Sequence, residues 1–229
     1  MVEDCAQVVV IHHDTVTLPK MANVSHLALD EVTFFSNVIG DLGPDARVQV
    51  LLNNGECHSH ILNTPSEQEL QRVDALTAVR NVHREDLELF ASSPIRHIRT
   101  GISTPIPFQV IRECIDHPNK FQRLESLSWV RWRGRSVRRF KQDILDFSSV
   151  LNATFTELRI LWESKGELTE TNGDFKACWV HKFHLLDILL VVRNTTHARA
   201  LDVTERVTHL MTKCAQHVKV DLLAYHPPP

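Results

Sequence analysis

The segment with the clearest potential for binding chemistry is basic and aromatic. From Asn119 to Lys141 the sequence holds eight lysines or arginines and a single acid, Glu125. Arginine guanidinium groups form forked hydrogen bonds with phosphates and carboxylates alike, and tryptophan rings can stack on nucleic-acid bases. The segment could therefore bind RNA or DNA, bind an acidic protein surface, or form a solvated face balanced by acids elsewhere. The candidate binding residues are Trp129, Arg131, Trp132, Arg133, Arg135, Arg138, Arg139 and Lys141.

Apolar side chains recur every three or four residues through this region, which predicts one long helix from Asn119 to Lys165. On such a helix most of the arginines would share about a quarter of the circumference, but Arg133 would fall on the apolar side. We therefore expect a kink, a helix end or an inter-helix ion pair at residues 133–134. The spacing suits either a bundle helix or a coiled coil. The stripe consists of Val137, Phe140, Ile144, Phe147, Leu151, Phe155, Leu158 and Trp162.

Two histidine groups are weaker candidates for metal binding or acid–base chemistry. His12, His13 and Asp14 follow a predicted strand, and His58 and His60 would project from the same side of another. The chain has 14 histidines, and no second cluster of ligands can be placed beside either group. Neither G-x-G-x-x-G nor a P-loop motif is present, and glycines number only seven. We expect no catalytic site, no bound metal and no cofactor.

Composition describes an ordinary globular protein. The 229 residues are 43% hydrophobic and 23% charged, with a formal net charge of −3, so the basic segment is a local feature of a mildly acidic chain. This balance argues against a general nucleic-acid coat protein. The five cysteines are far apart and form no C-x-x-C motif, which predicts neither a disulfide framework nor a structural zinc site. No secretory signal or membrane-spanning run is recognised, so we expect a cytoplasmic or nuclear protein.

The first half of the chain predicts a mixture of strands and helices. A strand is expected at Ala6–Ile11 and a helix at Ser25–Ile39. The residues from Arg47 to Leu62 read as a β-hairpin, because Asn54-Gly55 suits a two-residue type I′ turn. A capped helix should follow from Thr64 and bury Leu70, Val73, Leu76 and Val79.

The second half predicts helices throughout. Besides the long helix we expect helices at Phe108–Asp116, Phe175–Arg193 and Thr196–Leu223. Three prolines and a glycine between Pro94 and Pro107 suggest a boundary. The fold class is thus α+β: a small sheet-and-helix unit at residues 1–103 and a bundle of three or four helices at 104–229, which can pack as one domain. Strands confined to one half disfavour a doubly wound parallel sheet.

Three classes of function fit these features. The first is a non-enzymatic interaction or scaffold subunit of a larger complex, which would bind other proteins or self-associate through long amphipathic helices. The second is a nucleic-acid-associated protein that uses the Trp129–Lys141 segment. The third is a metal-dependent enzyme whose site would include the histidine groups. We favour the first class.

Overall fold

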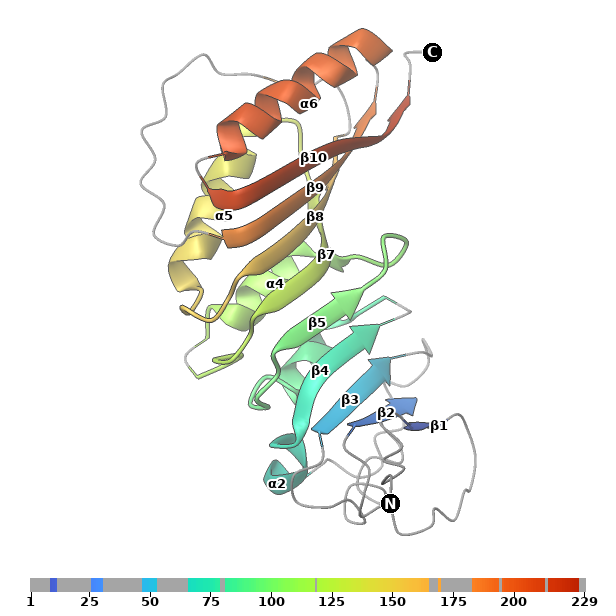
Figure 1. The fold of residues 1–229 in the computed structure, drawn as a ribbon, viewed down its shortest axis with the longest axis vertical. Helices are drawn as coiled ribbons and strands as arrows, with labels where there is room; N and C mark the ends of the chain where they lie inside the picture. The colour runs from blue at the N-terminus through green and yellow to red at the C-terminus, as the bar shows by residue number, and fades with distance from the viewer. Residues whose placement is uncertain are drawn as a thin grey trace, which may run out of the picture.

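The chain folds around one long, all-parallel β-sheet (Figure 1). The computed structural model describes residues 9–11, 26–30, 47–52, 66–78, 81–117, 119–164, 169, 183–193, 195–212 and 214–226. The strands are β1 (Val9–Ile11), β2 (His26–Asp30), β3 (Arg47–Leu52), β4 (Val73–Ala78), β5 (His97–Thr100), β6 (Ile106–Pro107), β7 (Ser126–Arg133), β8 (Glu157–Glu163), β9 (Phe183–Arg193) and β10 (Ala215–His226). The helices are α2 (Glu67–Leu70), α3 (Arg84–Leu89), α4 (Phe108–Ile115), α5 (Val137–Val150) and α6 (His197–Met211).

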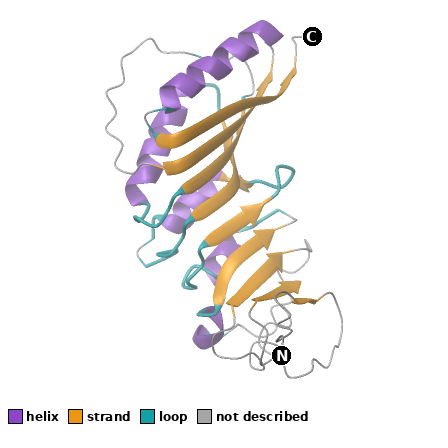
Figure 2. Ribbon diagram, viewed as in Figure 1, coloured by secondary structure: helices purple, strands orange, loops and turns teal. Residues whose placement is uncertain are grey.

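The strands lie side by side in the order in which they occur along the chain. That order is β1-β2-β3-β4-β5-β7-β8-β9-β10, and the short β6 pairs with the second half of β7. The described helices follow β3, β4, β6, β7 and β9, as in Rossmann-like α/β proteins, but the order of the described strands never reverses. Right-handed connections through these helices then cross the same face of the sheet. Figure 2 shows α4, α5 and α6 together on that face.

The predicted fold class is therefore wrong. In place of a small N-terminal sheet and a C-terminal helical bundle, one parallel sheet continues from the first half of the chain into the second, where β5 pairs with β7. No coiled coil is present in the described part of the chain. The expected boundary at residues 103–104 falls in the connection between β5 and β6.

The predicted long helix from Asn119 to Lys165 is three elements, namely β7, α5 and β8. Only the first half of its apolar stripe, from Val137 to Phe147, lies on a helix. Leu158 and Trp162 are buried as well, but they alternate along β8, where a spacing of two or four residues also returns to the same face. A break does occur at Gly134, where it separates a strand from a helix.

The two other C-terminal helices were predicted wrongly for a related reason. The described part of Phe175–Arg193 is β9, whose apolar side chains point to both faces of the sheet. Short apolar runs of this kind suit a buried parallel strand as well as a buried helix. The predicted helix Thr196–Leu223 is α6 followed by β10. Val218, Val220 and Leu222 have the two-residue alternation of a strand, which the helical interpretation overlooked.

The N-terminal predictions are partly right. β1 lies within the expected strand Ala6–Ile11, and in the second half α4 matches the expected helix Phe108–Asp116. The helix at Ser25–Ile39 is wrong, because β2 occupies His26–Asp30. The hairpin is wrong too, because β3 pairs in parallel with β2 on one edge and with β4 on the other. The capped helix ends as α2 at Leu70, and Val73 and Leu76 belong to β4.

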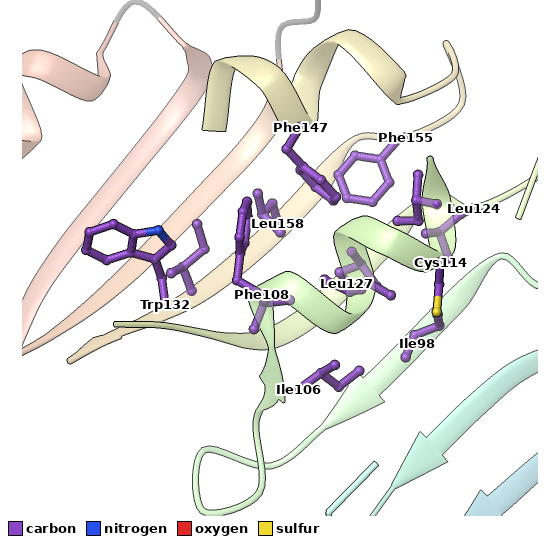
Figure 3. Packing of buried hydrophobic residues seen from close by; sticks show 14 of the residues in the cluster. Ile98, Ile106, Phe108, Cys114, Leu124, Leu127, Trp132, Phe147, Phe155 and Leu158 are labelled. Atoms are coloured by element: carbon purple, nitrogen blue, oxygen red, sulfur yellow. The ribbon is translucent and has the colours of Figure 1, made fainter. Parts of the chain in front are cut away.

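An aromatic core fills the space between the sheet and the helices (Figure 3). Phe140 of α5 stacks on Trp162 of β8 with ring centroids 4.1 Å apart, and Trp132 of β7 meets both rings edge-on at 5.1 Å. Phe147 of α5 continues the row toward Phe108 of α4, with centroids 5.4 Å apart. Large aromatic side chains bury much apolar area, so this row anchors α4 and α5 on β7 and β8.

A bulge in β7 marks the point where its neighbour changes from β5 to β6. The register shifts between Leu127 and Val130, and Trp129 adopts a positive φ of 50° there. The buried Thr100 hydroxyl lies 2.6 Å from the carbonyl oxygen of Ser128 and 3.1 Å from that of Trp129, and it donates its single hydrogen to this pair. Bulges re-aim the side chains that follow them. The bulge therefore sets the direction of the arginines at the end of β7.

Candidate functional site

The predicted basic segment spans the carboxyl end of β7, a short turn and the first turn of α5. Gly134 lies in the turn, and Ser136 caps α5 by accepting a hydrogen bond of 3.2 Å from the backbone N–H of Arg139. The end of a parallel strand and the start of the next helix therefore bring the arginines to one edge of the sheet.

Gly134 is held between two tryptophan side chains. A Cβ atom at this position would lie 2.3 Å from Cη2 of Trp132, far inside van der Waals contact. The indole Nε1 of Trp162 donates a hydrogen bond of 3.0 Å to the Gly134 carbonyl oxygen. The Gly134 amide in turn donates to the Glu163 carbonyl oxygen at 3.2 Å. The turn is thus fixed by contacts that only glycine permits.

A cleft of about 460 Å³ opens at this edge, and we call it the basic cleft. It carries four arginines from β7, the turn and α5, against one acid among its lining residues, Asp143. The lining residues are Pro107, Phe108, Gln109, Arg131, Trp132, Arg133, Gly134, Arg135, Ser136, Arg139 and Asp143.

Two acids hold three of these arginines near the cleft. Glu163 of β8 contacts both Arg133, at 2.8 Å, and Arg131, at 3.6 Å. Asp143 lies 3.8 Å from Arg139, whose side chain is 79% exposed, and accepts a hydrogen bond from the Trp132 indole. Arg135 is exposed and forms no ion pair with any residue that the structure describes.

The structure divides the eight predicted residues into two groups. Arg131, Trp132, Arg133, Arg135 and Arg139 meet at the basic cleft. The other three lie outside its lining. Trp129 is half-buried at the bulge with the Arg159 guanidinium 6.0 Å from its ring, Arg138 is exposed on α5, and Lys141 is buried at 7% exposure.

Base stacking by the tryptophans, as the nucleic-acid hypothesis proposed, has little support in this arrangement. Trp132 is only 4% exposed and packs in the aromatic core. Trp129 is half-buried beside Arg159. Nucleic-acid-binding surfaces that stack bases need open aromatic faces. The arginines therefore remain the chemically relevant part of the predicted segment.

The face of the sheet opposite the helices continues from the basic cleft, and we call it the helix-free face. Strand register places its side chains in rungs: Arg131, Leu161, Leu189 and Asp221 form one, and Arg159, Asp187 and Lys219 form the next. Leu161 and Leu189 are buried at 4% and 9% exposure, yet neither belongs to the core cluster under the helices. The first rung therefore has two buried leucines between an arginine and an aspartate, and the second is charged throughout.

Asp187 is the least expected residue of the helix-free face. It is 9% exposed, and its Oδ1 has no hydrogen-bond partner among the described residues. Burial raises the pKa of its carboxyl group, while nearby Lys219 and Arg159 offset part of this effect. Lys219 itself forms an ion pair of 2.6 Å with Asp221. A buried carboxylate oxygen that accepts no hydrogen bond lowers the stability of the folded protein.

Sequence reasoning missed Glu163, Asp143 and Asp187. Glu163 and Asp143 were assigned to the predicted long helix. In the structure Glu163 pairs with Arg133, thirty residues before it, and Asp143 pairs with Arg139, four residues before it. Asp187 carried a usable signal, since it is the single acid in the run from Phe183 to Val192. A lone acid within an apolar run is unusual enough to have been singled out.

The histidine candidates His12, His13, Asp14, His58 and His60 lie outside the residues that the structure describes. Within the described ranges, no three histidine, cysteine or acidic side chains are grouped as a metal site would require.

None of the helices described here is long and apolar enough to cross a membrane. No protein-family model, curated protein or solved structure matches this chain.

Proposed function

We propose that the chain is a non-enzymatic interaction subunit that binds an acidic segment of a partner protein in the basic cleft. The observation that carries this proposal is the convergence of four arginines on one cleft at the carboxyl edge of the sheet. Guanidinium groups pair with carboxylates through two parallel hydrogen bonds, which supplies both attraction and orientation.

Two features favour a protein partner over nucleic acid. The chain as a whole has a net charge of −3, which would repel a polyanion outside the cleft. The tryptophans of the basic segment are buried or half-buried, so stacking adds little. The helices are less suited to the contact than the sheet, because the apolar sides of α4, α5 and α6 face the core.

Affinity purification of the tagged chain from its native cells, with and without nuclease, tests the proposal. The variant is Arg135→Glu, and the matched control is Arg123→Glu, which makes the same charge change at an exposed residue outside the cleft. We expect a defined partner that survives nuclease, is lost from Arg135→Glu and is kept by Arg123→Glu. That partner should contain an acidic segment that binds the purified chain directly.

Three results would overturn the proposal. The first is recovery of RNA or DNA, with the proteins lost on nuclease treatment. The second is a chain that purifies alone. The third is equal loss of the partner from both variants, because binding would then depend on net charge rather than on the cleft.

A further inference from the structure

We infer that the basic cleft recognises a phosphomonoester, that is, a phosphorylated side chain on the acidic segment of the partner. This inference rests on the proposed function, because it names the group within that segment which enters the cleft. A phosphoserine, phosphothreonine or phosphotyrosine carries a charge of about −1.5 to −2 near neutral pH and three acceptor oxygens.

The charge of the cleft matches such a group. Four guanidinium groups line it, and Glu163 and Asp143 contribute two negative charges, which leaves a net charge of +2. A single carboxylate would neutralise only half of this excess. A phosphodiester of nucleic acid also carries one charge per phosphate, so it matches the cleft no better than a carboxylate.

The hydrogen-bonding state of the arginines points the same way. Arg131 Nε is buried without a hydrogen-bond acceptor among the residues that the structure describes, because Glu163 Oε1 lies 3.6 Å away. A buried N–H group without a hydrogen-bond partner destabilises the protein, so a ligand oxygen that accepts this hydrogen bond would remove the penalty. Arg135 and Arg139 are exposed and line the cleft, so their guanidinium groups can donate hydrogen bonds to a ligand. An acceptor with several oxygens can serve these groups together.

The acids hold the arginines in place before a ligand arrives. Glu163 bridges Arg131 and Arg133 across the β7–β8 pair, and Asp143 is held by the Trp132 indole while it faces Arg139. Preorganised donors lose less conformational entropy on binding than free surface side chains do. The cleft is therefore better suited to one compact anion than to a diffuse acidic surface.

The test uses the full chain and three short glycine–alanine peptides that differ at one central residue: phosphoserine, glutamate or serine. Binding is measured by titration calorimetry at constant ionic strength. We expect the phosphoserine peptide to bind roughly tenfold more tightly than the glutamate peptide and the serine peptide not to bind. Binding should weaken from about pH 7.5 to about pH 5, because the phosphate gains a proton with a pKa near 6.

Single arginine variants test whether the phosphoserine peptide binds in the basic cleft. Arg135→Gln and Arg139→Gln should each weaken phosphoserine binding roughly tenfold, whereas Arg123→Gln should not change it. In NMR spectra, the Arg131 Nε–H resonance should shift on addition of the phosphoserine peptide. Glutamine removes the charge without reversing it. The circular dichroism spectrum of each variant distinguishes loss of folding from loss of binding.

The outcomes separate this inference from the proposed function. Equal affinity for the phosphoserine and glutamate peptides would overturn the phosphate assignment and leave binding of acidic segments in place. Tighter binding of a single-stranded oligonucleotide than of either peptide would overturn both. Phosphoserine binding that is indifferent to Arg135→Gln and Arg139→Gln would overturn the assignment to this cleft.

Discussion

The Trp132 indole and the Asp143 carboxylate join the sheet to helix α5 at the basic cleft. Nε1 of Trp132 donates a hydrogen bond of 2.9 Å to Oδ2 of Asp143, and the side chain of Asp143 is only 19% exposed. The ring of Trp132 belongs to the core, whereas its polar edge reaches the binding site. One side chain therefore couples the stability of the fold to the geometry of the site.

Removing this hydrogen bond should destabilise the protein measurably. Trp132→Phe keeps an aromatic ring but loses the donor, and we expect it to lower the free energy of unfolding by about 2–3 kcal/mol. Asp143→Ala removes the acceptor and should cost about 1–2 kcal/mol. Urea denaturation of both single variants and the double variant gives the coupling energy of the pair. A coupling energy near zero would show that the hydrogen bond contributes nothing.

Gly134 should tolerate no larger side chain. In Gly134→Ala, the new methyl group would meet the Trp132 ring at 2.3 Å, and overpacking of this kind costs about 3 kcal/mol. Gly101→Ala is the matched control, because a Cβ atom there meets nothing closer than 3.5 Å. It should change the free energy of unfolding by less than about 0.5 kcal/mol. Thermal unfolding of the two variants side by side checks this, and equal effects would contradict the packing argument.

The bulge in β7 should depend on the hydroxyl group of Thr100. Thr100→Val keeps the shape of the side chain but removes the donor that faces the Ser128 and Trp129 carbonyl oxygens. We expect a loss of about 1–2 kcal/mol in urea denaturation. Thr100→Ser retains the hydroxyl and should lose less. A valine variant as stable as the wild type, or more stable than the serine variant, would show that the hydrogen bond of the hydroxyl group does not stabilise the bulge.

Asp187 should lower stability at neutral pH. Burial raises its pKa in the folded state above the unfolded value, so the folded state binds the proton more tightly and gains stability as pH falls through the folded pKa. Asp187→Asn removes this titration and should raise the free energy of unfolding by about 1 kcal/mol at pH 7. The advantage of the variant should shrink as pH falls toward about 4, which denaturation of both proteins across this range measures. A constant difference would mean that the pKa of Asp187 is not raised.

Local elements were predictable from the sequence where a single spacing rule applied. Helix α4 follows from the spacing of its apolar residues, and the break at residues 133–134 follows from Arg133 and Gly134. The longer prediction failed because Leu158 and Trp162, four residues apart, satisfy a helix and a strand equally. Only Ile160 between them, also buried, distinguishes the two, and the helical stripe left it out.

The composition of the site was predictable, but its geometry was not. Five of the eight predicted basic-segment residues line the cleft, because their proximity in sequence keeps them close in any fold. Glu163 lies thirty residues from Arg133, and only the parallel pairing of β7 with β8 brings them to the same rung. Pairing between distant segments leaves no local pattern in one sequence, so Glu163 could not be identified in advance.

The strictly sequential strand order also affects how such a protein can change over evolutionary time. Each interior strand of the main path meets only the strands before and after it on that path, and no connection has to thread past another. Duplication or deletion of one strand-and-crossover unit would therefore lengthen or shorten the sheet while the remaining pairings survive. The basic cleft is built within consecutive units around β7 and β8, so it would be inherited intact by a longer or shorter descendant.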